Sequence, residues 1–169
     1  MPDLETQQRQ AVIAGALTWE RTPWVHQGRI KGSGVDCLML LAEVFERAGL
    51  VPHLELVEDP ANLTPEQRAS GHIFVKKYPK DWHCHSREEK ALEVVQQFAR
   101  EISGPPQPGD VGLCQYGWVL SHGFIVLDWP LILHAVADST VQKGDGNQIV
   151  IKGKRPLRTV FYSYWVGGE

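Results

Sequence analysis

The chain has 169 residues, a length typical of one domain, and its 43% of hydrophobic residues is enough for a single core. Lys and Arg total 17 against 20 for Asp and Glu, and the resulting charge of −3 gives no electrostatic reason to bind nucleic acid or an anionic membrane. Three cysteines without a C-x-x-C pair argue against a disulfide framework and against a zinc ribbon. We therefore expect a single domain over residues 1–169.

The N-terminal residues form neither a basic region nor an apolar core of a secretion signal. No stretch approaches the roughly 18 to 20 apolar residues that a membrane-spanning helix needs. We expect a soluble protein that is cytoplasmic when synthesised.

The first half of the chain predicts helices. Residues from Leu4 to Trp19 form a moderately amphipathic stretch after a polar start. A loop rich in Gly and Pro follows, and Asp36 can then cap a second helix whose apolar residues return every three or four positions until Gly49. Cys37 lies in the first turn of this second helix.

The segment from Val51 to Trp82 lacks a regular pattern, apart from a short helix predicted after Thr64 and Pro65. We expect an insertion around residues 51–85 that carries function or specificity. Ser86 to Glu89 has the pattern of a capping box for a third helix, whose apolar face continues to Ile102.

After residue 110 the pattern changes to short runs of β-branched and aromatic residues separated by Gly, Asp and Pro. These runs predict strands over Val111–Tyr116, His122–Leu127, Leu131–Val136, Gln148–Ile151 and Leu157–Tyr164. Helices followed by strands predict an α+β fold, in which N-terminal helices pack on a central antiparallel sheet of about five strands.

Cys37 has the setting of a reactive cysteine. At the start of a helix, free backbone N–H groups and the positive end of the helix dipole favour a thiolate, although the adjacent Asp36 opposes this effect. Catalysis also needs a base within hydrogen-bond reach and a group that orients the base. Cys114, by contrast, alternates with core residues and is predicted to be an ordinary strand residue.

Two histidines on neighbouring predicted strands can supply the base and its orienting group. A hairpin around residues 128–130 would place His122 and His134 nearly opposite one another, with the exact neighbours set by the strand register. His122 is the candidate base, and His134 is the candidate orienting group. Asp138 could orient the base instead of His134.

At this point the sequence resembles the NlpC-type cysteine peptidases. Four of their motifs occur in family order: the Asp-Cys nucleophile motif at Gly34–Leu41, the start of the first core strand at Pro108–Asp110, the histidine strand at Ser121–Val126 and the third catalytic position at His134–Ala135. Thr22–Gly32 and Tyr78–His85 resemble the subgroup found in phage tails and gene-transfer particles. Leu38 departs from the pattern, because many relatives have a small residue after the cysteine, and this changes the shape of the pocket.

The resemblance implies a papain-like fold and hydrolysis of peptidoglycan stem peptides, typically at the D-γ-glutamyl-diaminopimelate bond, without a metal or an organic cofactor. In this role Cys37 is the nucleophile, His122 exchanges its proton and His134 orients His122. It also implies a place in a virion tail or particle, with other tail-tip proteins as partners. The substrate is expected to contact Trp24, His26, Gln27, Arg29, Asp36, Trp118 and Ser121.

Other functions remain open at this point. A tail-tip protein could keep the fold as a structural assembly module. A metal-dependent hydrolase could use His83 and His85, which an extended segment would point to the same side, but no second pair of ligands is found at metal-site spacing. Acyl transfer by the same cysteine and histidine differs from hydrolysis only in what resolves the thioester.

Overall fold

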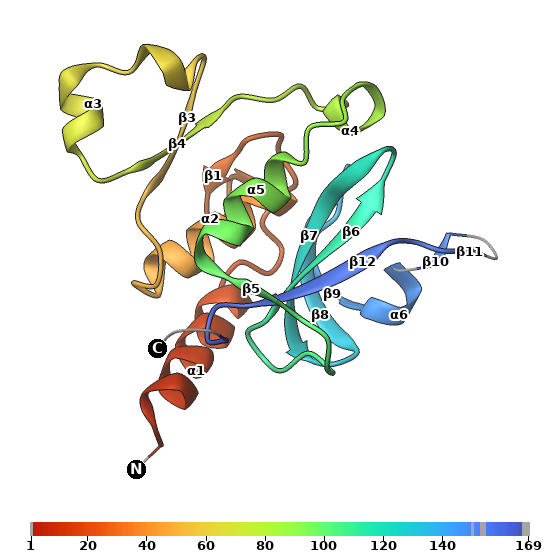
Figure 1. Cartoon of the computed structure of the whole chain (residues 1–169). Coiled ribbons are helices and arrows are strands. Elements are labelled where there is room, and N and C mark those ends of the chain that lie inside the picture. Colours follow the sequence, from red (N-terminus) through yellow and green to blue (C-terminus); the bar gives the residue numbers. More distant parts are fainter. Residues whose placement is uncertain (1, 150, 153–154, 167–169) are drawn as a thin grey trace.

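A computed structural model describes residues 2–149, 151–152 and 155–166 (Figure 1). Its centre is an antiparallel sheet of six strands in the order β5-β12-β6-β7-β8-β9. The strands are β5 (Arg100–Ile102), β6 (Val111–Tyr116), β7 (Val119–Asp128), β8 (Leu131–Ala135), β9 (Val141–Asp145) and β12 (Thr159–Ser163). Helices pack on this sheet, so the α+β prediction is confirmed, with six strands in place of about five.

The first two helices form where the sequence predicts them. Helix α1 (Leu4–Leu17) begins after Asp3, whose side chain accepts a hydrogen bond from the Thr6 N–H. Helix α2 (Cys37–Arg47) begins after Asp36 and buries its apolar face against the sheet, because Leu40 and Val44 belong to the same core as the strand residues. Cys37 is therefore fixed at the start of a buried helix, as expected.

A turn at residues 108–110 joins α1 to the sheet. Gly109 adopts a φ of +90°, and the Asp110 carboxylate accepts hydrogen bonds from the Gln107 N–H at 2.8 Å and from Arg9 Nη1 at 2.9 Å. Asp110 is buried, so these donors replace the water it has lost. The motif that was predicted to precede the first core strand therefore lies directly before β6.

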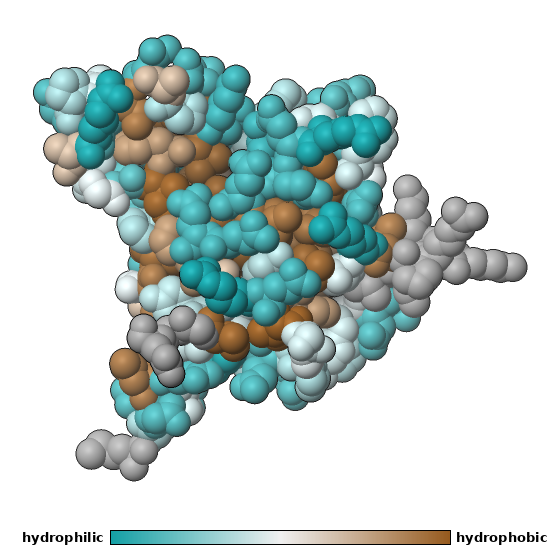
Figure 2. Space-filling view, viewed as in Figure 1, coloured by the Kyte–Doolittle hydropathy of each residue, from teal (hydrophilic) through white to brown (hydrophobic). Residues whose placement is uncertain are grey.

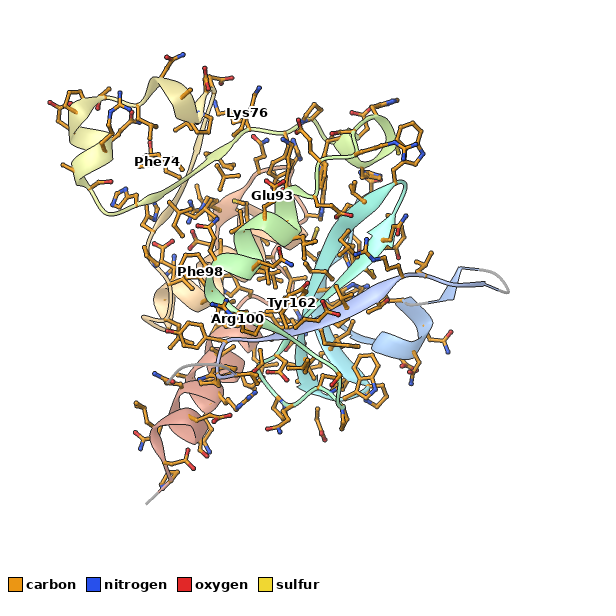
Figure 3. The ribbon with its side chains drawn as sticks, in the orientation of Figure 1. Phe74, Lys76, Glu93, Phe98, Arg100 and Tyr162 are labelled. Atoms are coloured by element: carbon orange, nitrogen blue, oxygen red, sulfur yellow. The ribbon has the colours of Figure 1, made fainter. Side chains whose placement is uncertain are left out.

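The third helix is shorter than predicted. Helix α5 (Lys90–Phe98) ends four residues before Ile102, and residues 100–102 form β5, which pairs with β12. Figure 3 shows Phe98 at the end of the helix and Arg100 on the strand, near Tyr162 of β12. Backbone pairing with the sheet edge overrides the helical periodicity in this segment.

The predicted capping box at Ser86–Glu89 is also wrong. Glu89 makes no side-chain cap to α5, and its carboxylate instead accepts hydrogen bonds from the Leu120 N–H at 2.8 Å and from Arg158 Nη1 at 3.2 Å. Glu89 thus ties the start of α5 to β7. A local sequence pattern could not reveal partners that lie so far along the chain.

Residues 51–77 form an arm that extends from the body (Figure 1). Its strands β3 (Leu54–Val57) and β4 (Ile73–Lys76) pair in parallel and are joined by η1 (Pro60–Asn62) and α3 (Pro65–Ala69). Thr64 and Gln67 form a capping box, so the short helix predicted there is confirmed. Figure 2 shows hydrophobic residues where the arm meets the body, and these apolar contacts help to hold it there.

The chain returns from the arm through α4 (Trp82–His85). His83 and His85 therefore lie on a helical turn and not on the extended segment that would have pointed both side chains to the same side. The Trp118 N–H, in the turn between β6 and β7, donates to the His83 carbonyl at 2.9 Å. Gly117 adopts a φ of +68° and lies so close that a Cβ there would be 2.3 Å from the same oxygen. Only glycine allows this approach between α4 and the hairpin.

The C-terminal part differs most from the prediction. Residues 146–149 form the short helix α6 (Gly146–Ile149), and a strand pair follows from β10 (Ile151–Lys152) and β11 (Arg155–Pro156). The strand predicted over Gln148–Ile151 is therefore wrong for residues 148 and 149, and residue 150 lies outside the described residues. Strand β9 escaped prediction because its residues are mostly polar, as suits an edge strand.

Candidate active site

Cys37, His122 and His134 line one open cleft of about 340 Å³. Cys37 lies at the start of α2 beside β7, where its thiol donates a weak hydrogen bond to the Ser121 carbonyl at 3.6 Å. Helix and strands therefore bring together all three candidate catalytic residues. The other residues that line the cleft are Trp24, His26, Asp36, Leu38, Tyr78, Lys80, Trp82, His83, Tyr116, Ser121, Ala135, Val136 and Ala137.

The two histidines meet across β7 and β8. Ile125 pairs with Leu133, and continuing this antiparallel register places His134 opposite residue 124. His122 lies two residues before residue 124 in β7 and on the same face, so the two histidines are diagonal neighbours and not directly opposite. His122 Nε2 lies 3.0 Å from His134 Nδ1, and the two imidazole rings are nearly perpendicular, with an interplanar angle of 80°. This hydrogen bond leaves His122 Nδ1 as the nitrogen that can exchange a proton.

The three candidate catalytic residues, Cys37, His122 and His134, are neutral at physiological pH. Burial, reinforced by the charge of Asp36, raises the pKa of the Cys37 thiol to about 12. Burial, followed by the neighbouring His134, lowers the pKa of His122 to about 3, and burial lowers the pKa of His134 to about 4. The thiolate expected at the helix start is therefore not the resting form, because loss of water outweighs the helix dipole.

Asp36 is a structural anchor beneath the nucleophile. Its buried carboxylate accepts hydrogen bonds from the N–H groups of Leu38 and Met39 and from the Gln27 N–H at 2.8 Å. The Tyr78 hydroxyl also donates to it at 3.0 Å. Four donors therefore satisfy Asp36, and its side chain holds the first turn of α2 in place.

The cleft contains some of the expected substrate contacts but not others. Trp24, His26, Asp36 and Ser121 line it. Gln27, Arg29 and Trp118 do not, and they have other partners. Gln27 donates through Nε2 to the Tyr78 carbonyl at 2.7 Å, and the exposed Trp118 ring lies under the Arg87 guanidinium at 5.0 Å.

Arg29 joins the arm to the body and does not face the cleft. Its guanidinium pairs with Glu43 at 2.7 Å and with Glu46 at 3.0 Å, and it also donates to the Leu54 carbonyl at the start of β3. The structure does not support the expected contact of Arg29 with the substrate, because two glutamates of α2 already neutralise its guanidinium.

The remaining candidate residues are also placed. Asp138 pairs with Lys80 at 3.4 Å, so His134 is the residue that contacts the candidate base. His85 pairs with Asp81 at 3.0 Å, and His83 lines the cleft. In the part of the chain that the structure describes, no three His, Cys, Asp or Glu side chains gather as metal ligands. Cys114 is fully buried in β6, as predicted.

A second cavity, of about 100 Å³, lies between the arm, α2 and α5. Its lining is almost wholly apolar, with Phe45, Val75 and Val94 among its residues, and Cys37 is not part of it. We assign this cavity to the packing of the arm on the body. Within the described residues, no helix is long and apolar enough to cross a membrane.

Comparison with known proteins identifies the fold. No protein-family model and no curated protein matches the sequence. The NlpC/p60 domain of the peptidoglycan hydrolase SagA matches with a TM-score of 0.51 and 15% identity, over 90% of this chain and 96% of that chain. This chain has the fold of an NlpC/p60 domain.

Other NlpC/p60 structures give the same result. The peptidoglycan hydrolase RipB from Mycobacterium tuberculosis matches with a TM-score of 0.54 and 14% identity, over 97% of this chain and 68% of that chain. NlpC1 from Trichomonas vaginalis matches with a TM-score of 0.58 and 11% identity, over 96% and 47%. This chain thus spans about half the length of NlpC1. The papain-like, NlpC-type fold that the motifs predicted is confirmed.

Tyr116 and Lys80 line the cleft, although neither was predicted as a site residue. The Tyr116 ring meets the His122 ring edge to face, with centroids 5.6 Å apart, and so shields one side of the candidate base. Lys80 lies over Trp24 at the rim of the cleft. Lys80 belongs to the segment Tyr78–His85, which the sequence singled out, but its side chain could not be placed in the cleft without knowledge of the arm.

Proposed function

We propose that this protein is a cysteine amidase that hydrolyses an amide bond in peptidoglycan stem peptides. The observation that carries the proposal is the meeting of a helix-start thiol with the hydrogen-bonded pair of His122 and His134 in one open cleft. The peptidoglycan substrate is supported by the sequence motifs and by structural neighbours that are themselves named peptidoglycan hydrolases.

In the proposed mechanism, the thiolate and the imidazolium form only as the Cys37 sulfur attacks the substrate. Because thiol and imidazole are both neutral at rest, Nδ1 of His122 takes the thiol proton as Cys37 Sγ bonds to the scissile carbonyl carbon. The imidazolium then protonates the leaving amine, and a thioester remains. His122 next takes a proton from water, whose oxygen attacks the thioester, and the proton returns to the Cys37 sulfur as the carboxylic acid leaves.

The first turn of α2 provides a donor for the oxyanion. The Asp36 side chain accepts from the N–H groups of Leu38 and Met39, and its carbonyl accepts from the Leu40 N–H. Among the described residues these bonds do not use the Cys37 N–H, and in the proposed mechanism it meets the negative charge on the carbonyl oxygen. Such a donor is commonly worth about 100-fold or more in rate.

Two finer points belong to the same proposal. The bond cut is of the D-γ-glutamyl-diaminopimelate type, and the protein acts as part of a phage tail or a related particle. The support is the resemblance of the nucleophile and histidine motifs for the first point, and of Thr22–Gly32 and Tyr78–His85 for the second. The alternative of a structural tail-tip module predicts that Cys37→Ala leaves particles assembled and infectious.

The test is digestion of purified stem peptides by the wild type, Cys37→Ala and Cys84→Ser, with products identified by mass spectrometry. Cys84 is the matched control, because it is an exposed thiol outside the lining of the cleft. We expect the wild type and Cys84→Ser to release a new amine terminus and Cys37→Ala to release none. Equal cleavage by Cys37→Ala, or no cleavage of several wall chemotypes by the wild type, would contradict the proposal.

A further inference from the structure

Lys80 is the only lysine or arginine among the described residues that line the cleft. We propose that Lys80, supported by Trp24, binds a carboxylate of the substrate, so that this site prefers an anionic peptide to the same peptide with a carboxamide. The proposal rests on the proposed amidase function and adds the chemistry by which the substrate is recognised.

The backbone on both sides of Lys80 is fixed. Tyr78 and Trp82 are both buried, and the Trp82 N–H donates to the Pro79 carbonyl at 3.1 Å, which closes a turn around Lys80. The Tyr78 carbonyl also accepts a hydrogen bond from His26 Nε2 at 2.8 Å, which restrains the backbone a second time. The Lys80 side chain therefore starts from a defined point at the rim, although it is itself 58% exposed.

Trp24 supports the side chain from below. The Lys80 Nζ lies 4.8 Å from the centroid of the Trp24 ring, within the range of a cation–π contact. The ring is held in turn, because the Trp24 N–H donates to the Ser139 carbonyl at 2.8 Å and the residue bridges to Val35. The aliphatic part of a lysine can rest on such a ring while the ammonium stays in water, available to an incoming anion.

The ion pair that Lys80 forms with Asp138 is weak. Asp138 Oδ1 lies 3.4 Å from Nζ, and its side chain is 85% exposed, so water screens the pair. A substrate carboxylate can therefore replace Asp138. The other charged group of the cleft, Asp36, is buried and already accepts four hydrogen bonds, so it does not compete for Lys80.

Four other titratable side chains of the cleft, two histidines and two tyrosines, add no negative charge to it. Burial lowers the pKa of His122 and of His134 far enough for both rings to be neutral, and Tyr116 and Tyr78 have raised pKa values, so they carry no negative charge. An anionic group at the rim thus meets one positive charge and one exposed, displaceable carboxylate.

The test uses pairs of synthetic stem peptides that differ only in one free carboxylate or its carboxamide, with each carboxylate of the peptide varied in turn. Lys80→Met keeps a long apolar side chain over Trp24 and removes the charge, whereas Lys80→Arg keeps the charge. For one carboxylate, we expect Lys80→Met to raise the KM of the acid peptide roughly ten-fold and to change that of the carboxamide less than about two-fold. Lys80→Arg should retain the preference, with kcat within about two-fold throughout.

Asp138→Asn provides a second readout of the same site. It removes the competing carboxylate and keeps the side-chain size, so the KM of the acid peptide should fall, by about two-fold. Equal effects of Lys80→Met on acid and carboxamide peptides would show that Lys80 acts only on the structure. An unchanged KM for every acid peptide would also overturn the proposal.

Calorimetry separates failure of this proposal from failure of the proposed function. Binding of acid and carboxamide peptides is measured on Cys37→Ala and on Cys37→Ala combined with Lys80→Met. If the wild type cleaves no peptide, the amidase proposal fails, and the carboxylate proposal still stands or falls on whether Lys80→Met removes the preference in binding. If Cys37→Ala binds no peptide of either kind, the carboxylate proposal fails as well.

Discussion

Gly144 on β9 offers a way to move His134 without changing any group of the cleft. A Cβ at Gly144 would lie 2.8 Å from His134 Nε2 and 3.4 Å from its Cδ2. Ordinary contacts of this kind are about 3.5 Å, so the ring must move by roughly 0.7 Å. Gly144 pairs with Ile132 in a regular ladder and lacks a positive φ, so the backbone itself accepts alanine.

We expect Gly144→Ala to weaken the bond between the two histidines. That bond is 3.0 Å long, and His134 is only 8% exposed, so its ring has little room to retreat. A shift of about 0.7 Å exceeds what a normal hydrogen bond tolerates, and the loss of about 1 to 1.5 kcal/mol lowers kcat by roughly ten-fold. Removal of glycine freedom from the unfolded chain offsets part of the steric cost in stability.

The assay is kcat on a stem peptide together with the free energy of unfolding from urea titration. Gly15→Ala is the matched control, because a Cβ at this position of α1 would have none of the described atoms within 4 Å apart from its chain neighbours and the backbone of its own helix. It should leave kcat unchanged and raise the free energy of unfolding by roughly 0.5 to 1 kcal/mol. A folded Gly144→Ala protein with the kcat of the wild type would refute the role of His134 in orienting His122.

Two further predictions concern pH and the arm. His122 can accept a proton only above its pKa of about 3, and the Cys37 thiol keeps its proton only below its pKa of about 12. We therefore expect kcat/KM to be constant between about pH 5 and 9. A pH–rate profile in which kcat/KM falls on the acid side with a midpoint at about 6.5 would contradict this. Arg29→Met should lower the free energy of unfolding by roughly 2 to 3 kcal/mol, because it strands the nearly buried Glu43. Arg47→Met is the control, because it removes a partner of Glu43 that is 56% exposed. In the same urea titration it should lower the free energy of unfolding by less than about 1 kcal/mol. Equal losses for the two variants would argue against the anchoring role of Arg29.

Local signals explain what the sequence could predict. The start of α2 was predictable because a capping Asp36, a following apolar period and the closing Gly49 all lie within a short stretch. The capping box at Thr64 and Gln67 is local in the same sense. For His122 and His134 the sequence placed both on adjacent strands, but only the pairing of the strands decides that the contact is diagonal.

Long-range partners explain what the sequence could not predict. The parallel pairing of β3 with β4 joins two short segments whose patterns are not distinctive on their own. Arg29 resembled a free substrate contact until the fold placed Glu43 and Glu46 beside it. Lys80 reaches the cleft only because the chain returns from the arm across Trp24.

The close contact of Gly117 with the His83 carbonyl has a consequence for how such a protein can change its specificity. The hairpin that carries His122 and the segment that carries Lys80 touch at this point. A chimera that receives a foreign segment over residues 51–85 must present a carbonyl at the same place to the Trp118 N–H. If it does, the substrate-binding segment can be exchanged while the hairpin with the candidate base stays unchanged. Gly117 must be kept in any such chimera, because only glycine allows the close contact.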